Sequence, residues 1–286
     1  GFYLWSESTD VALADPLAGQ ETIARLVADK VAPEVDVDGA PGARRQSDNL
    51  AARNWYLQGR YHLNQRTEEG LQKAVEFFEK AIIEDTQFSL AHSGLADAYG
   101  LLAHYGVLGP ADVWAKAASS AGAAVMLDGH SAEAHTSLAH VRATQDWDFN
   151  GAEALFQKAV QLNPRYSTAR HWYAMSCLVP LGRLDEALEQ ILLAQSLDPV
   201  SAIIARDVAV AHYYRRDFDA ALEQCDHTIE LNPHFAPAYH TLGLVQEQRK
   251  EIDEAAAAFR RAVDLAPNSL RMQSALARIL ALSGKP

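Results

Sequence analysis

The sequence predicts an all-α fold built as a linear array of helix pairs, and three observations predict it. First, prolines follow apolar stretches at a nearly fixed interval: Pro164, Pro199, Pro233 and Pro267 lie 35, 34 and 34 residues apart. Second, apolar stripes with helical spacing lie between these prolines. Third, hydrophobic residues make up 49% of the chain and Ala is abundant, which suits close helix packing. Because a proline restricts the residue before it, each one indicates where a helix pair ends.

Residues 236–267 give the clearest unit. The residues of its first stripe are Tyr239, Leu242 and Gly243, spaced i, i+3, i+4, and those of its second are Ala255, Phe259 and Ala262, spaced i, i+4, i+7. Two such short helices cannot bury their stripes alone. The units must therefore stack on their neighbours.

The same stripes recur through the chain, so each unit predicts two further helices. From the amino terminus the matching sets are Trp55, Gly59, Ala74, Phe78 and Ala81; His92, Leu95, Ala96, Tyr99, Ala117, Ala121, Ala124 and Gly129; His135, Leu138, Ala139, Ala152, Phe156 and Ala159; Arg170, Tyr173, Ala174, Cys177, Ala187, Ile191 and Ala194; Ala205, Val208, Ala209, His212, Ala221, Cys225 and Thr228. With the unit ending at Pro267 they make six repeats. The apolar run Leu270, Leu276, Ala277 and Leu280 predicts a capping helix over 270–283.

These residues resemble the tetratricopeptide repeat (TPR), whose pattern places small and aromatic residues in a first helix, then Ala, Phe and Ala, then Pro. The resemblance implies a right-handed superhelix of six helix-turn-helix repeats plus the capping helix, spanning residues 50–286. Such arrays bind proteins rather than catalyse reactions.

Residues 1–33 do not follow the repeat. Phe2–Trp5 predicts a short strand and Leu17–Ala32 a helix. Together they resemble the end of the TolB-amino-terminal-like α/β domain that precedes TPR arrays in bacterial regulatory proteins, so we expect a strand-helix remnant of an upstream domain. Residues 34–49, with Gly39, Pro41 and Gly42, predict a linker. The exposed strand is expected to lack fixed structure, fold back on the first repeat, or pair with a second copy in a homo-oligomer.

Composition excludes several classes of function. The formal net charge of −12 opposes nucleic-acid binding through this region. No apolar run approaches the roughly 20 residues of a membrane span. The two cysteines, Cys177 and Cys225, fall on repeat core positions in different units and predict buried thiols in a cytoplasmic protein.

No chemical motif is present. The histidines do not form a ligand pair on one helix face, and no nucleophile elbow, phosphate loop or dinucleotide fingerprint occurs. His92 and His135 fall on a stripe position and are expected to pack. We therefore predict no catalytic residue, no metal and no cofactor.

The resemblance places partner-binding residues on the first helices, which line a concave groove. The residues at the corresponding positions are Tyr56, Arg60, Asn64, Ser93, Asp97, Thr136, His140, His171, Trp172, Met175, Arg206, Asp207, Tyr213, Tyr214, His240, Thr241 and Glu247. Mixed aromatic and charged side chains favour an extended peptide or a partner helix. The Lys and Asn pair that clamps chaperone tails in this family is absent, so an Hsp70 or Hsp90 tail is not implied. For Trp172 two interpretations stay open: a partner anchor, or a side chain that fills the gap to the next repeat.

Three functions remain. The first is an interaction or sensory module of a bacterial regulatory or signalling protein, such as a transcription regulator. The second is the substrate-recruiting arm of an enzyme, such as an adenylate cyclase, a protein kinase or a glycosyltransferase, whose catalytic domain lies outside this chain. The third is a small-molecule sensor with the insertion His104–Pro110 as a lid, although a surface insertion is the simpler interpretation.

A second interruption, Asp146–Phe149, joins the helices of the third repeat. We expect Trp147 and Phe149 to pack beneath this turn while the aspartates cap the next helix. The alternative is an exposed aromatic pair that binds a partner.

Overall fold

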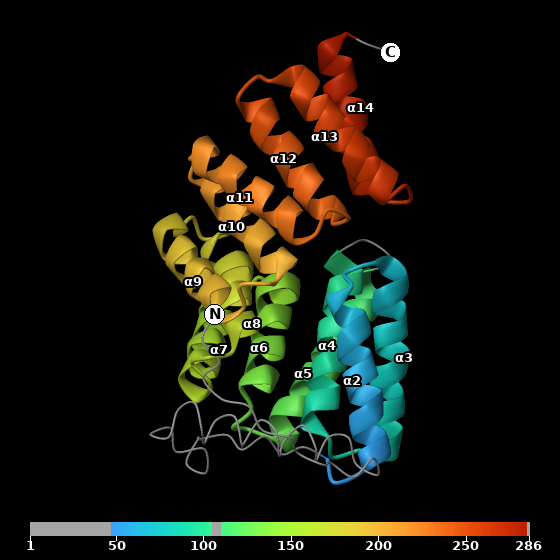
Figure 1. Cartoon of the computed structure of the whole chain (residues 1–286). Helices are drawn as coiled ribbons and strands as arrows, with labels where there is room; N and C mark the ends of the chain where they lie inside the picture. Colours follow the sequence, from blue (N-terminus) through green and yellow to red (C-terminus); the bar gives the residue numbers. More distant parts are fainter. Residues whose placement is uncertain (1–46, 105–109, 285–286) are drawn as a thin grey trace, which may run out of the picture. The chain divides into compact units, whose positions relative to one another are not determined.

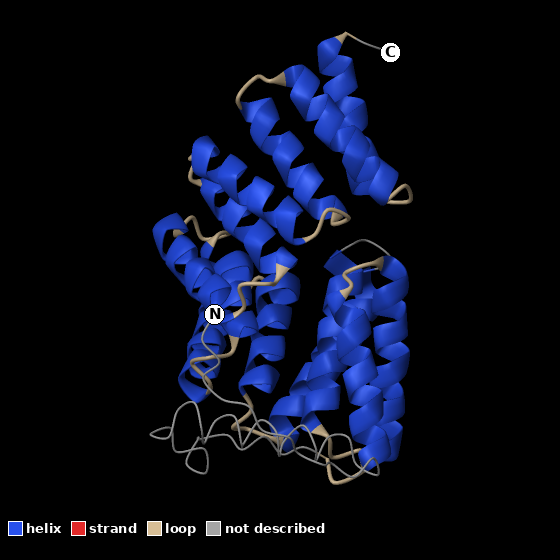
Figure 2. Cartoon of the chain, viewed as in Figure 1, coloured by secondary structure: helices blue, strands red, loops and turns tan. Residues whose placement is uncertain are grey.

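A computed structural model describes residues 47–104 and 110–284 of the chain. This part contains thirteen α-helices, two short π-helical segments and no strand (Figures 1 and 2). The first helices of the pairs are α2 (Leu50–Asn64), α4 (Ser89–His104), α6 (Ala132–Val141), α8 (Ser167–Trp172), α10 (Ala202–Tyr214) and α12 (Ala236–Gln248). The second helices are α3 (Glu68–Glu84), α5 (Pro110–Leu127), α7 (Phe149–Leu162), α9 (Leu184–Leu197), α11 (Phe218–Leu231) and α13 (Ile252–Leu265), and the last helix is α14 (Leu270–Ser283).

Each helix packs against the next one along the chain, which gives six pairs followed by α14. First helices of successive pairs also contact one another, as α2 with α4, α4 with α6 and α10 with α12. The predicted all-α repeat fold is confirmed, including the capping helix. The predicted strand and helix of residues 1–33 lie outside the described residues, as does most of the insertion after His104.

The repeat core consists of the predicted second-helix aromatics set against glycines. Phe78 and Phe259 are fully buried. A Cβ atom at Gly59 or Gly94 would lie 2.6 or 2.5 Å from the Phe78 ring, and one at Gly243 would lie 2.6 Å from Phe259. Since Cβ contacts under about 3 Å do not occur without movement, the missing side chain of each glycine lets the helices approach.

A side chain near the start of most first helices is hydrogen-bonded to the backbone carbonyl six residues earlier, in the preceding turn. The pairs are His92 with Thr86, His135 with Gly129, Arg170 with Pro164 and Tyr239 with Pro233, and α14 repeats the contact through Gln273 and Pro267. His92 and His135 are therefore packed structural residues, as expected. These bonds give a partner to a backbone carbonyl of the turn between two repeats.

The two π-helical segments explain why the repeat period is not constant. Arg142–Asp146 extends α6 and Tyr173–Leu178 extends α8. The repeats that contain them are 35 residues long, whereas those ending at Pro233 and Pro267 are 34 residues long. An i to i+5 hydrogen bond encloses one more residue than an α-helical bond, so the additional residue is absorbed inside the first helix.

The turn between the helices of a pair uses a left-handed residue at the same place in all five of the turns that the structure describes. These residues are Arg66 (φ 55°), Trp147 (φ 55°), Gly182 (φ 72°), Arg216 (φ 64°) and Lys250 (φ 66°). This conformation costs a non-glycine residue roughly 1 kcal/mol or more. The conformation recurs because it reverses the chain within a few residues.

The expectation that Trp147 packs beneath the turn at Asp146–Phe149 was wrong. The expectation that the aspartates cap the next helix was right for Asp148 alone. Trp147 is 74% exposed, because its left-handed backbone directs the side chain away from the core. Phe149 is half-buried against the core, and its ring lies edge-on to Trp147 with centroids 6.1 Å apart. The Asp148 carboxylate accepts a hydrogen bond from the Gly151 backbone N–H and caps α7, whereas Asp146 ends the preceding π-helical segment.

Candidate partner-binding face of the first helices

We define the first-helix face as the set of predicted partner-binding residues, and burial divides this set in two. The buried members are Ser93, Asp97, Thr136, His140, His171, Trp172, Asp207, His240 and Thr241. The accessible members are Tyr56, Arg60, Asn64, Met175, Arg206, Tyr213, Tyr214 and Glu247. A partner can touch the second group directly, while the first group can only support it.

Four of the eight buried polar members, Asp97, His140, His171 and Asp207, form side-chain hydrogen bonds between successive first helices. We define the polar ladder as Asp97, Ser137, His140, Ser176, His171 and Asp207. Ser137 Oγ donates to Asp97 Oδ1 at 2.6 Å and joins α6 to α4. His140 Nδ1 and Ser176 Oγ are 3.0 Å apart and join α6 to the extension of α8. His171 Nε2 donates to Asp207 Oδ2 at 2.5 Å and joins α8 to α10.

Burial places the two carboxylates of the ladder in different states. Removal from water raises the pKa of Asp97 to about 7, although the Ser137 hydrogen bond and the positive charge of Arg60 oppose this shift. Burial also acts to raise the pKa of Asp207, but Arg206, whose Nη1 lies 2.7 Å from Oδ1, and His171 outweigh it and lower the pKa overall. Asp207 is therefore a buried paired charge, whereas Asp97 titrates near neutral pH.

Two histidines of the face, His140 and His240, are neutral near pH 7. Burial lowers the pKa of His140 to about 3 and that of His240 to about 4. A buried neutral imidazole packs as an aromatic ring and adds no positive charge to the face. The lasting positive charges near the ladder therefore come from arginines such as Arg60 and Arg206.

The state of Asp97 makes stability depend on pH in a predictable direction. The pKa of Asp97 in the folded protein lies above its ordinary value of 3.8. The contribution of this group to the free energy of unfolding is therefore fully present below pH 3.8 and is lost as the pH rises through about 7. Wild type should therefore lose about 2 kcal/mol or more through this group between pH 5 and pH 8, and Asp97→Asn should not.

Thermal unfolding of both proteins across this pH range tests the expectation. His140 and His240 act in the opposite sense, because their contribution is present above 6.5 and is lost as the pH falls through their lowered pKa values. Both proteins keep these histidines, so the difference between the two curves isolates Asp97. A difference that stays constant from pH 5 to pH 8 would contradict the assignment.

The accessible aromatic residues are held by the core beneath them. The Tyr56 ring is tilted over Phe78 and Phe88, with centroids 5.9 and 5.2 Å apart. Tyr213 lies edge-on to Tyr214 at 5.6 Å and near Phe218 at 6.2 Å. These rings are only partly free of the protein, so a partner could bury the remaining surface at little cost in side-chain entropy.

Charges of both signs accompany these rings. Burial acts to lower the pKa of Arg60, but the proximity of Tyr56, Tyr166 and Asp97 raises it overall, so the guanidinium remains charged. Glu247 forms an ion pair with Arg278 of α14. Arg60 and Glu247 therefore present opposite charges in the first and sixth repeats.

Trp172 is a core residue in this structure. It is 4% exposed, its ring centroid lies 4.4 Å from that of His140, and it belongs to a cluster that includes Ile204 and Val208 of α10. This placement favours the interpretation in which Trp172 fills the gap between repeats. The neighbouring Met175 is only half-buried and is better placed to meet a partner.

Several residues that shape this face escaped the sequence prediction. Ser137 and Ser176 complete the ladder, and Tyr166, in the turn before α8, lies near Arg60. No sequence signal marks these serines, because small polar residues are common on packed helices. Their role appears only when the partner helix is placed beside them.

No group of three or more His, Cys, Asp or Glu side chains suited to a metal ion occurs in the part of the chain that the structure describes. Cys177 and Cys225 are buried free thiols, and burial raises the pKa of Cys177 to about 11 and of Cys225 to about 12. A thiol of such high pKa is a poor nucleophile at neutral pH. Among the described helices none is long and apolar enough to cross a bilayer.

Similar proteins share the fold and, over a limited region, the sequence. The transcriptional regulator HilA of Salmonella typhimurium is 26% identical over 171 residues, which is 60% of this chain and 31% of HilA. A chain of the APC/C hetero-tetramer Cut9–Hcn1 superposes with a TM-score of 0.61 at 18% identity, covering 92% of this chain and 47% of that one. Pseudomonas aeruginosa PilF superposes with a TM-score of 0.52 at 18% identity, covering 80% and 97%.

The chain spans about a third of the length of HilA. The sequence model of the tetratricopeptide repeat family matches residues 207–269, which contain α11, α12 and α13 and the carboxy-terminal half of α10. The repeated helix pairs on either side share the same stripes and the same turn geometry. Residues 207–269 therefore match the tetratricopeptide repeat model, and the described helices share the superhelical fold of TPR proteins.

Proposed function

We propose that the array is a non-catalytic interaction module that holds a peptide or a partner helix on its first-helix face. Protein interaction is the role that the TPR fold implies. One observation supports the first-helix face as the binding site. The side chains of Tyr56, Met175 and Tyr213 are partly exposed, while the helices that carry the face are held together by buried hydrogen bonds. Residues of this kind supply most of the binding energy of protein interfaces.

The division of the face supports this assignment. The buried members Asp97, His140, His171 and Asp207 fix the spacing of the first helices through their hydrogen bonds, whereas the partly exposed charges Arg60, Arg206 and Glu247 can orient a partner. A surface that is fixed in advance loses less entropy on binding. Asn64 adds an exposed amide at the end of α2.

The similarity to the transcriptional regulator HilA supports a bacterial regulatory protein as the setting. As part of the same proposal, the protein works in the cytoplasm and recruits other proteins through this array. We place the activity of the whole protein outside the array. The rival assignment, a recruiting arm of a larger enzyme, uses the same face and differs only in the domain to which the array is joined.

Peptides selected from a random library against the array provide the probe that tests the site. Met175→Ala with Tyr213→Ala should weaken binding of a selected peptide by about 2 kcal/mol or more, measured by titration calorimetry. Circular dichroism should show unchanged helical content, because both side chains are only half-buried.

A matched control changes two apolar side chains elsewhere: Tyr61→Ala, 65% exposed on α2, with Met126→Ala, 90% exposed on α5. This double variant should bind as tightly as wild type. Equal dissociation constants for all three proteins would move the site away from the first-helix face.

A further inference from the structure

The exposed surface of α9 carries apolar side chains where polar ones would be expected. Leu192 is 42% exposed and Leu193 is 39% exposed. Val200, just beyond the end of the helix, is 77% exposed. Three large apolar residues so close together leave an apolar patch uncovered.

The fourth repeat differs in this respect from the others. The two residues that follow the core position of Ile191 are Leu192 and Leu193, whereas the matched pairs are Glu79-Lys80, Gly122-Ala123, Gln157-Lys158, Asp226-His227 and Arg260-Arg261. Val200 likewise matches Arg165, His234 and Asn268. The repeat fold therefore does not require apolar residues at these positions, and their presence on α9 needs another explanation.

A groove runs beside this patch between α9 and α11. It has a volume of about 680 Å³, and Leu192 and Pro199 line it on the α9 side. Gln195 Nε2 donates to Gln224 Oε1 at 3.2 Å and links the two helices. The groove is wide enough for side chains of another molecule. Gln195 and Ser196 also line its α9 side, so this wall is mixed, with Leu192 and Pro199 as its apolar part.

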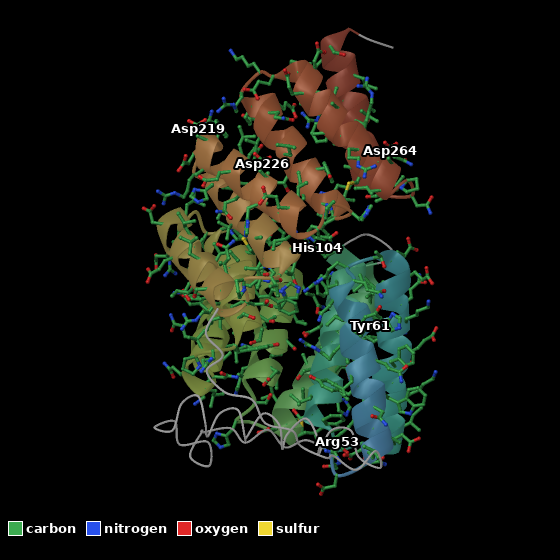
Figure 3. All side chains as sticks on the ribbon, in the orientation of Figure 1. Arg53, Tyr61, His104, Asp219, Asp226 and Asp264 are labelled. Carbon is green, nitrogen blue, oxygen red and sulfur yellow. The ribbon has the colours of Figure 1, made fainter. Side chains whose placement is uncertain are left out.

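The opposite wall is acidic. Glu223, Asp226 and Glu230 of α11 line the groove at spacings i, i+3 and i+7, so they lie on one face of the helix (Asp226 is labelled in Figure 3). All three are exposed, and none forms an ion pair within the described part of the chain. No Lys or Arg lines the groove. The negative charge of this wall is therefore available to a cation from outside.

We propose that the groove between α9 and α11 docks a cationic amphipathic helix of a protein partner, with apolar side chains on Leu192 and Pro199 and Lys or Arg side chains on the α11 carboxylates. The exposed apolar side chains of Leu192 and Pro199, which lie opposite an acidic wall, match the two faces of such a helix. This surface is separate from the first-helix face, so the module holds two partners, or two segments of one partner, at the same time.

A synthetic peptide tests the proposal on the full chain. The probe is a fluorescein-labelled peptide of about fourteen Leu and Lys residues with Leu at helical spacing, long enough for about four helical turns. Fluorescence anisotropy should show binding of this peptide and none of a matched peptide with Glu in place of each Lys.

Two variants separate the contributions of the walls. The first variant, Leu192→Gln with Leu193→Gln, places polar residues where most other repeats have them, so the protein should still fold. It should raise the dissociation constant of the peptide about tenfold or more. Glu223→Gln, Asp226→Asn and Glu230→Gln together should raise it about threefold to tenfold and reduce its dependence on salt.

The controls address general attraction to an acidic protein. Glu76→Gln, Glu84→Gln and Asp264→Asn remove as many exposed carboxylates from α3 and α13 and should leave the dissociation constant unchanged (Asp264 is labelled in Figure 3). If this control weakens binding as much as the groove variant, or if the leucine variant binds as wild type, the proposal fails. It also fails if sedimentation shows a dimer of the chain that the leucine variant abolishes, because a second copy would then be the occupant.

Discussion

Trp172→Ala is expected to lower the free energy of unfolding by about 3 to 5 kcal/mol. The side chain is 4% exposed and packs with Ile204 and Val208, so its removal leaves a cavity between the fourth and fifth repeats. It also removes the ring that lies 4.4 Å from His140 and so loosens the polar ladder. Denaturant unfolding followed by circular dichroism measures the loss.

The chain offers a matched control in Trp147→Ala. Trp147 is 74% exposed, so its removal should change the free energy of unfolding by less than about 0.5 kcal/mol. Similar small losses for the two variants would show that Trp172 is not part of the core, and its role as a partner anchor would then have to be considered again.

Deletion of residues 270–286 should destabilise the last repeat by about 5 kcal/mol, because α14 covers its apolar face. Ile279 is fully buried against Ala255 and Phe259, and Met272 packs on Ala262. Without α14 the side chains of Ala255, Phe259 and Ala262 would be exposed to water. Since stability in an array passes mainly between neighbours, the loss should fall steeply toward the amino terminus.

Hydrogen exchange resolves this gradient. Amides of α12 and α13 should lose protection in the shortened chain, while those of α2 to α5 should keep theirs. In the full chain Ile279→Asn should reproduce much of the effect, and Leu282→Asn, at a position 63% exposed, should not. Uniform loss of protection along the array, or none at all, would show that α14 is not a cap.

The fold could be predicted because each repeat has buried residues at the same spacing. The spacing of Ala255, Phe259 and Ala262 defines a buried stripe without reference to any distant residue, and the prolines fix the phase. The bounds of α14 followed for the same reason. Patterns of this kind can be recognised in the sequence because the contacts that they predict join residues close together along the chain.

The site could be predicted only in part. Family positions identified which residues lie on the first helices, but not which are buried, because burial depends on how closely consecutive first helices approach. Trp172 and Tyr213 look alike in sequence, yet one lies under His140 and the other is half-exposed. Trp147 was misplaced because its left-handed backbone, and not its hydrophobicity, sets its direction. The exposed Leu192 stands out only when the repeats are compared with one another.

The polar ladder limits how freely this array could be recombined. Repeat proteins are often treated as modular, with units that can be excised, duplicated or transplanted between chains. Here the Asp207 carboxylate depends on His171 of the preceding repeat, and Asp97 depends on Ser137 of the following one. A cut between the fourth and fifth repeats would remove the His171 hydrogen bond from Asp207 and leave this carboxylate with Arg206 as its remaining partner, at a cost of about 1.5 to 3 kcal/mol. A cut after Pro233 crosses no ladder bond, so we expect a graft to be tolerated better there than between the fourth and fifth repeats.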